Sequence, residues 1–291
     1  MLKFSDLPLS VEDPEFHDHI MKMFAECIST YPFPCYSLAR NTRQKFIPMK
    51  PEHAIKLIDV AVFSDLRLKT CVDVGANIGA FSCLASENFK KVYAFEPIKQ
   101  NYDYLKQVLD RSCVSNVETY NLAAHSTNNE KIKIFHGPDE TSGGATVLSD
   151  GGEYEECETI SLEGIYELVG EDTIDYMKVD IEGAEYSFLL GKDLSRVNLL
   201  SMELHGEKEK IEEMLRFLEE EFYLLWLDGS EQHMHKDINV ITGINKKMLT
   251  SHNKNVCGVF YPGFQDIKIL HGPDRNPINP KAEGFGENND S

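Results

Sequence analysis

The segment that most restricts the fold runs from Cys71 to Phe81, where a short apolar stretch leads directly into Gly75 and Gly79. A buried strand followed by a glycine turn and a helix is the opening unit of a doubly wound α/β sheet. Glycines let the backbone turn tightly and approach a ligand, and the helix behind them presents unpaired N–H groups. We therefore expect a ligand site at this turn.

Short apolar runs alternate with helical stretches from about residue 70 onward, which predicts βα units and a mostly parallel sheet. Seven strands are expected, at Thr70–Val74, Lys91–Phe95, Val117–Leu122, Ile174–Val179, Leu199–Leu204, Tyr223–Leu227 and Asn239–Ile244. Helices are expected at Ala80–Ser86, Gln100–Asp110, Leu162–Val169, Ala184–Leu190 and Glu207–Glu221, and an inserted strand pair at Lys131–Phe135 and Glu158–Ser161. The predicted fold class is α/β, with a Rossmann-like, seven-stranded, mostly parallel sheet and helices on both faces.

The two ends of the chain differ from this central pattern. Residues 1–65 are expected to form an N-terminal helical extension, because Asp13-Pro14 suits a helix start and apolar residues then recur at helical spacing. A second helix is expected from Pro51. Residues 66–246 then form the sheet domain, and residues 247–291, rich in Asn, Gly and Pro, a partly flexible tail.

Charge limits the classes of partner. The chain carries 29 Lys and Arg against 48 Asp and Glu, a formal net charge of −19, and shows no basic patch. Such a surface repels phosphate backbones and anionic lipids, so neither a nucleic-acid nor a membrane partner is expected. No secretory signal or apolar run of about 20 residues is visible, and the 7 scattered cysteines suit free thiols. A cytoplasmic location is therefore expected, with the oligomeric state open.

A second signal stands at Phe95-Glu96-Pro97, about 20 residues beyond the glycine turn. A carboxylate at the end of the neighbouring strand can accept both hydroxyls of a ribose. Asn77 stands where the dinucleotide fingerprint has its second glycine, which disfavours a nicotinamide cofactor. Asp73, within the strand end, suits a ligand that carries a cationic amine. Together these residues predict a nucleoside site.

The stretch from Thr70 to His205 resembles the FkbM family of class I S-adenosylmethionine-dependent methyltransferases. The resemblance is carried by Val72–Gly79, Phe95–Pro97, Asn121–Ala124, Asp175–Glu185 and Met202–His205. It implies a cofactor site for S-adenosylmethionine made by Asp73 near the ammonium, Gly75, Ala76, Asn77 and Gly79 around the methionine end, Glu96 at the ribose, Ala123 beside the adenine, and Asp180.

Further polar residues follow the central strands, outside whose carboxyl ends the reacting centre of an open α/β sheet lies. Asp180, Glu182 and His205 are the expected catalytic residues, as bases or as groups that orient the acceptor, with Glu203 beside them. The same carboxylates could instead hold a divalent cation that acidifies a hydroxyl, or cap the following helix. Lys178 is expected to pack in its strand and neutralise nearby carboxylates.

The resemblance implies methyl transfer to an oxygen, as in a hydroxyl of a sugar or small metabolite. The acidic composition suits a neutral, polyhydroxylated acceptor better than an anionic one. Two alternatives remain open at this point. One is a nicotinamide-dependent oxidoreductase on a Rossmann-like fold, and the other is a non-catalytic binding protein that retains the fold.

Overall fold

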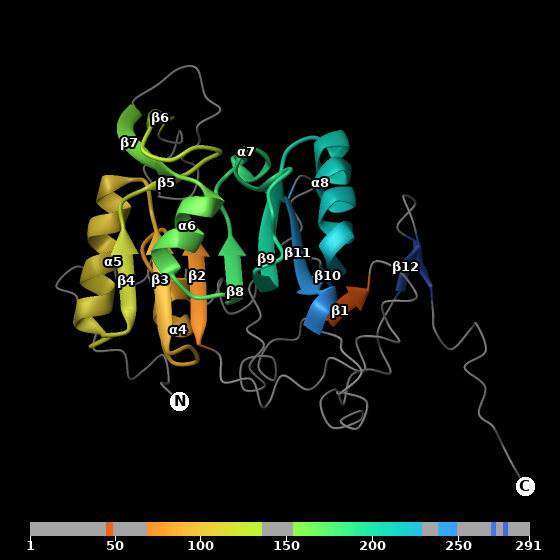
Figure 1. Ribbon diagram of the computed structural model, residues 1–291, viewed down its shortest axis with the longest axis horizontal. Helices are drawn as coiled ribbons and strands as arrows, with labels where there is room; N and C mark the ends of the chain where they lie inside the picture. The colour runs from red at the N-terminus through yellow and green to blue at the C-terminus, as the bar shows by residue number, and fades with distance from the viewer. Residues whose placement is uncertain are drawn as a thin grey trace, which may run out of the picture.

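The computed structural model describes residues 45–48, 69–135, 154–228, 238–248, 269–271 and 276–278. An eight-stranded sheet in the order β1-β10-β11-β9-β8-β2-β3-β4 forms the centre (Figure 1). Its strands are β1 (Lys45–Pro48), β2 (Thr70–Val74), β3 (Lys91–Phe95), β4 (Val117–Tyr120), β8 (Ile174–Val179), β9 (Val197–His205), β10 (Phe222–Asp228) and β11 (Ile238–Asn245). The helices are α4 (Ala80–Ala85), α5 (Lys99–Arg111), α6 (Leu162–Val169), α7 (Glu185–Leu189) and α8 (Lys208–Glu221).

Five strands, β4, β3, β2, β8 and β9, run parallel to one another, and β11 lies antiparallel between β9 and β10. The predicted seven-stranded, mostly parallel sheet is thereby confirmed, with strand ends that differ by one or two residues. Each helix predicted between residues 80 and 221 is also present. Regular alternation of apolar strands with amphipathic helices was enough to locate them.

The eighth strand, β1, was not predicted. It lies within the segment expected to form a helical extension, and it pairs antiparallel with β10, with Lys45 opposite Asp228. The edge of β10 would otherwise expose a row of unpaired N–H and C=O groups, which an added strand satisfies. The two helices predicted near residues 13 and 51 lie outside the described residues.

Helices cover both faces of the sheet, as predicted. On one face α6 and α8 pack against Val72, Met177 and Leu200 through residues such as Ile165 and Leu215. Figure 1 shows α6 in front of the strands on this face. On the other face Cys83 of α4 and Leu105 of α5 pack against Ala94 of β3. Because side chains alternate along a strand, Asp73 of β2 points away from the α6 face that holds Val72 and Val74.

The chain leaves β2 toward β3 on one side and later returns to β8 on the other, so a switch point lies at the carboxyl end of β2. Ligands of open α/β sheets bind at such points. A small sheet of β5 (Ala123–Ala124), β7 (Tyr154–Ile160) and β6 (Lys131–Phe135) contains the predicted inserted pair. In Figure 1 it lies at the end of the molecule toward which the arrows of β2, β4 and β8 point.

The remaining described elements are a short pair, β12 (Ile269–His271) with β13 (Asn276–Ile278), and a 3₁₀ turn at Lys246–Met248. Among the residues that the structure describes, no helix combines the length and the apolar character needed to cross a membrane.

Candidate active site

The turn after β2 is fixed by its neighbours on both sides. Gly75 and Ala76 both donate backbone N–H groups to the carbonyl of Phe95, at 3.0 and 2.9 Å. The φ angles of Gly75 and Asn77 are +79° and +51°. A Cβ on Gly75 would lie 1.7 Å from the Asp180 carbonyl oxygen, so only glycine lets the two loops approach this closely. The turn after β2 and the loop after β8 therefore form one continuous wall.

Glu96 is held rigidly at the end of β3. Its Oε2 accepts the N–H of Asn77 at 2.8 Å, and its Oε1 accepts the N–H of Ile98 at 2.9 Å. The residue is only 4% exposed. Burial raises the pKa of the Glu96 carboxyl to about 7, although the two backbone hydrogen bonds act in the opposite direction. The carboxylate is thus oriented before any ligand arrives, at the position predicted for a ribose contact.

A small, partly open cleft lies over the carboxyl ends of β2, β3 and β8. It brings together most of the predicted cofactor residues. The predicted site residues that line it are Gly75, Asn77, Glu96, Ala123, Asp180 and Glu182. Ile134 of β6 also lines the cleft, so the inserted strands contribute a wall that the motifs did not indicate.

The other predicted site residues lie around this cleft and outside its lining. Ala76 is buried in the turn, and Gly79 begins α4 with a φ of +90°. A Cβ on Gly79 would lie 2.5 Å from a methyl group of Leu105, so this glycine allows close packing of α4 on α5. His205 stands beyond Glu182, with its Nε2 at 3.4 Å from Glu182 Oε2.

Asp73 is completely buried beneath the turn. Its Oδ2 accepts the hydroxyl of Ser82 at 2.6 Å, and its Oδ1 lies 3.3 Å from Lys178 Nζ. Lys178 also donates to the Gly75 carbonyl at 2.8 Å and lies 3.5 Å from Asp180 Oδ2. In this structure Asp73 faces the core, and its predicted contact with a ligand ammonium stays a prediction. Lys178 lies among carboxylates, as the sequence suggested.

Glu185 is the site residue that sequence reasoning missed. It is fully buried at the start of α7, and its Oε1 lies 3.0 Å from His205 Nδ1. The same oxygen accepts the N–H of Gly183 at 3.1 Å and that of Ile181 at 3.4 Å. Glu185 thereby joins the loop after β8 to the end of β9. Its place in the Asp175–Glu185 motif, three residues after Glu182, was the available signal.

Burial and the surrounding charges together set the protonation states of Glu182 and His205. Burial raises the pKa of the Glu182 carboxyl to about 7; the neighbouring carboxylates add to the rise, and the charge of His205 opposes it. Burial alone would lower the pKa of His205. The hydrogen bond to Glu185 and the surrounding carboxylate charges outweigh it and raise the pKa to about 9. At neutral pH His205 is therefore an imidazolium ion and Glu182 is partly ionised.

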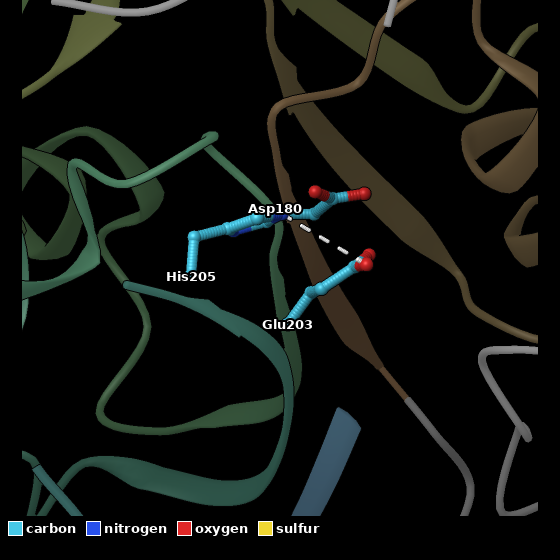
Figure 2. A group of neighbouring side chains, drawn as sticks. All are labelled: Asp180, Glu203 and His205. Atoms are coloured by element: carbon cyan, nitrogen blue, oxygen red, sulfur yellow. Dashed lines mark ion pairs between the residues drawn. The ribbon is translucent and has the colours of Figure 1, made fainter. Parts of the chain in front are cut away.

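Asp180, Glu203 and His205 offer ligand atoms that all lie within 4.8 Å of one another. Figure 2 shows the three side chains converging from the end of β8 and from β9. This spacing is compatible with a cation. Two protein cations already lie here, since His205 Nε2 is 3.9 Å from Glu203 Oε1 and Lys178 reaches Asp180. We assign none of the three as a metal ligand.

The strand order of the sheet, the glycine turn after β2 and the carboxylate of Glu96 after β3 are the features of one class of protein. This class is the class I, S-adenosylmethionine-dependent methyltransferases. The family model described as the methyltransferase FkbM domain matches residues 73–225, more than half of the 291 residues. The chain belongs to the FkbM methyltransferase family. A search of the curated proteins found no match.

Solved structures of similar shape include other methyltransferases. An FkbM methyltransferase from Methylobacillus flagellatus is 16% identical, with a TM-score of 0.44 over 82% of this chain and 57% of that one. An rRNA methylase from Streptococcus thermophilus is 16% identical, with a TM-score of 0.42 over 67% and 96% of the two chains. A putative methyltransferase from Streptococcus mutans, in complex with S-adenosylhomocysteine, is 12% identical, with a TM-score of 0.39 over 67% and 98%.

Proposed function

We propose that this methyltransferase transfers a methyl group from S-adenosylmethionine to a hydroxyl oxygen of a small, neutral acceptor such as a sugar. The observation that carries the proposal is the cleft, which has Glu96 at one part of its wall and the carboxylates Asp180 and Glu182 at another. The first suits a ribose, and the others suit a hydroxyl that must lose its proton. A Cβ on Gly75 would collide with the Asp180 carbonyl oxygen, so glycine is needed where the turn after β2 meets the loop after β8.

The residues divide into those that hold the cofactor and those that act on the acceptor. Gly75, Asn77, Glu96 and Ala123 would hold the nucleoside and the methionine half. When bound, S-adenosylmethionine supplies a methyl group on a positively charged sulfur, which becomes a neutral thioether when the acceptor oxygen takes the methyl. Glu182 lines the cleft and is the candidate base for the acceptor proton. His205 would hold Glu182 in place through its Nε2, and Asp180 would orient the hydroxyl.

The test is methyl transfer from radiolabelled S-adenosylmethionine to a panel of neutral polyols, amines and RNA. Transfer to a hydroxyl compound, with little transfer to RNA, is the expected result. Glu96→Ala should lower the affinity for S-adenosylhomocysteine, whereas Glu209→Gln, an exposed change on α8, should not. Preferential labelling of RNA or of an amine would contradict the proposed acceptor and leave the methyltransferase class intact.

Two measurements separate the proposed enzyme from its rivals: calorimetry tests for an oxidoreductase, and the Glu96→Ala variant tests for a non-catalytic binding protein. A nicotinamide-dependent oxidoreductase would bind NADH or NADPH and not S-adenosylhomocysteine, the reverse of what the Glu96 site predicts. A non-catalytic binding protein would keep its biological activity in the Glu96→Ala variant. The proposed enzyme should lose it.

A divalent cation is the remaining alternative for activating the hydroxyl. Lys178 and His205 already supply positive charge beside Asp180 and Glu203. We therefore expect dialysis against EDTA to leave the rate of methyl transfer within about twofold, as judged against an untreated sample. A large loss that Mg²⁺ restores would instead favour a metal bound by Asp180, Glu203 and His205.

A further inference from the structure

The part of the cleft around Glu182 carries more carboxylates than cations. Asp180 and Glu182 line the cleft, and Glu203 and the buried Glu185 stand behind them. A single imidazole, His205, contacts three of these four side chains. Lys178 reaches Asp180, but it is shared with Asp73. This excess of partly buried negative charge favours the binding of a positively charged ligand.

The order of the walls across the sheet indicates which part of S-adenosylmethionine would lie here. Ala123 follows β4, Glu96 follows β3, Gly75 follows β2, and Asp180 and Glu182 follow β8. These strands are neighbours in the order β4, β3, β2, β8. With adenine near Ala123 and ribose at Glu96, the methionine half and its sulfur extend toward the β2 turn and the β8 loop.

We propose that Glu182 distinguishes S-adenosylmethionine from S-adenosylhomocysteine by the charge on the sulfur atom. The inference rests on the methyltransferase function proposed above. The sulfur of the methyl donor carries a permanent positive charge, and the sulfur of the demethylated product is neutral. An ionised carboxylate nearby stabilises the first and has no such attraction for the second. The site would therefore hold the substrate more tightly than the product and favour product release.

Glu182 suits this role better than its neighbours. Asp180 also lines the cleft, but its side chain is less exposed, at 24% against 36% for Glu182. Glu185 is fully buried against His205 and the loop backbone. Glu182 combines a place in the cleft wall with a side chain 36% exposed. Its backbone has a φ of +50°, in the left-handed region, which residues other than glycine seldom adopt.

The pH dependence provides a signature that a merely structural glutamate would lack. The charged groups that face Glu182 are Asp180 in the same loop, Glu185 on α7, and Glu203 and His205 on β9. Because burial raises the pKa of Glu182 to about 7, the carboxyl is partly protonated near neutral pH. A cation bound beside it favours the ionised form, so S-adenosylmethionine should release protons that S-adenosylhomocysteine does not. The preference for the methyl donor should rise between pH 6 and pH 8.

The experiment is isothermal titration calorimetry of the full chain with each of the two ligands, without acceptor, at pH 6, 7 and 8. Two buffers of different ionisation enthalpy give the protons released. Glu182→Gln should weaken S-adenosylmethionine by about three- to tenfold. It should leave S-adenosylhomocysteine within about twofold and remove the excess proton release. The amino groups of the ligands titrate in both proteins, so their contribution cancels.

Two further variants complete the design. Glu209→Gln, exposed on α8, should behave as the wild type. His205→Gln removes a charge that lowers the pKa of Glu182, so the midpoint of the pH dependence should move upward. This variant tests the idea even where Glu182→Gln does not fold.

The outcomes are separable. Equal weakening of both ligands by Glu182→Gln, or a ligand preference in the wild type that stays constant from pH 6 to pH 8, would overturn the role of Glu182. The methyltransferase function would survive that result. Failure of the wild type to bind either ligand would instead overturn the proposed function, and the inference with it.

Discussion

Lys178 and Asp73 form an ion pair inside the sheet, with Nζ and Oδ1 3.3 Å apart and side chains only 4% and 0% exposed. The same ammonium donates to the Gly75 carbonyl, so the pair connects the core to the turn that borders the cleft. Removing one partner leaves the other charge buried and uncompensated, which costs about 3 to 5 kcal/mol. We expect Lys178→Met to lose stability of that order in urea unfolding, and S-adenosylhomocysteine to bind more weakly.

The matched control is Lys91→Met, which breaks an exposed ion pair with Glu118 and should cost far less. Combining Lys178→Met with Asp73→Asn should destabilise less than the two changes added together, because the second substitution removes the charge that the first one strands. Strict additivity would show that the two side chains are not energetically coupled.

Gly75→Ala tests the close approach of the two loops. The added Cβ would lie 1.7 Å from the Asp180 carbonyl at a φ of +79°, so backbone must move. Gly170 has a similar φ of +67°, but a Cβ added there would meet nothing within 4 Å. Gly170→Ala should therefore cost only the backbone strain, about 1 kcal/mol. Gly75→Ala should cost about 3 kcal/mol or more and reduce S-adenosylhomocysteine binding. Similar losses in both variants would show that strain alone requires glycine at the turn.

Glu96 should make stability fall as the pH rises through the weakly acidic range. The folded carboxyl titrates near pH 7, above its usual value of 4.5, because it is buried. Between these two values the folded state binds more protons than the unfolded state, so unfolding becomes easier as the pH increases. Glu96→Gln removes this titration. Its stability relative to the wild type should therefore be greater at pH 8 than at pH 5 in urea melts, whatever constant offset the amide introduces.

Periodicity predicted the framework well because its causes are local. Strand β2 is a short apolar run that ends at a glycine, and α8 shows a regular stripe of Ile211, Met214, Leu215 and Leu218. The gathering of Gly75, Glu96 and Asp180 around one cleft followed from parallel strands ending at the same edge. None of these inferences needed a long-range contact to be known in advance.

The parts that escaped prediction depend on contacts between distant residues. Strand β1 is only four residues long and is stabilised by the edge of β10, nearly 180 residues later in the chain. The alternation of side chains along β2 puts Asp73 and Val72 on opposite faces of the sheet. It does not show which face holds the ligand and which face holds Lys178. Glu185 becomes a site residue only because β9 brings His205 within 3.0 Å. Such pairings are decided by the tertiary structure.

His205 makes a pH-dependent contribution to stability that a surface histidine with an unshifted pKa would not make. Its folded pKa is raised to about 9, from a usual 6.5, by Glu185 and the neighbouring carboxylates, despite burial. A raised histidine pKa contributes stability in full below about pH 6.5, and this contribution is lost as the pH rises toward 9. His205→Gln should therefore be less stable than the wild type at pH 6, on the order of 2 kcal/mol, and close to it at pH 9.5. Urea unfolding at both values, with Glu209→Gln as control, measures the difference. A deficit of equal size at both pH values would mean that His205 stabilises the loop through packing, and that its charge is not what holds Glu182 and Glu185 together.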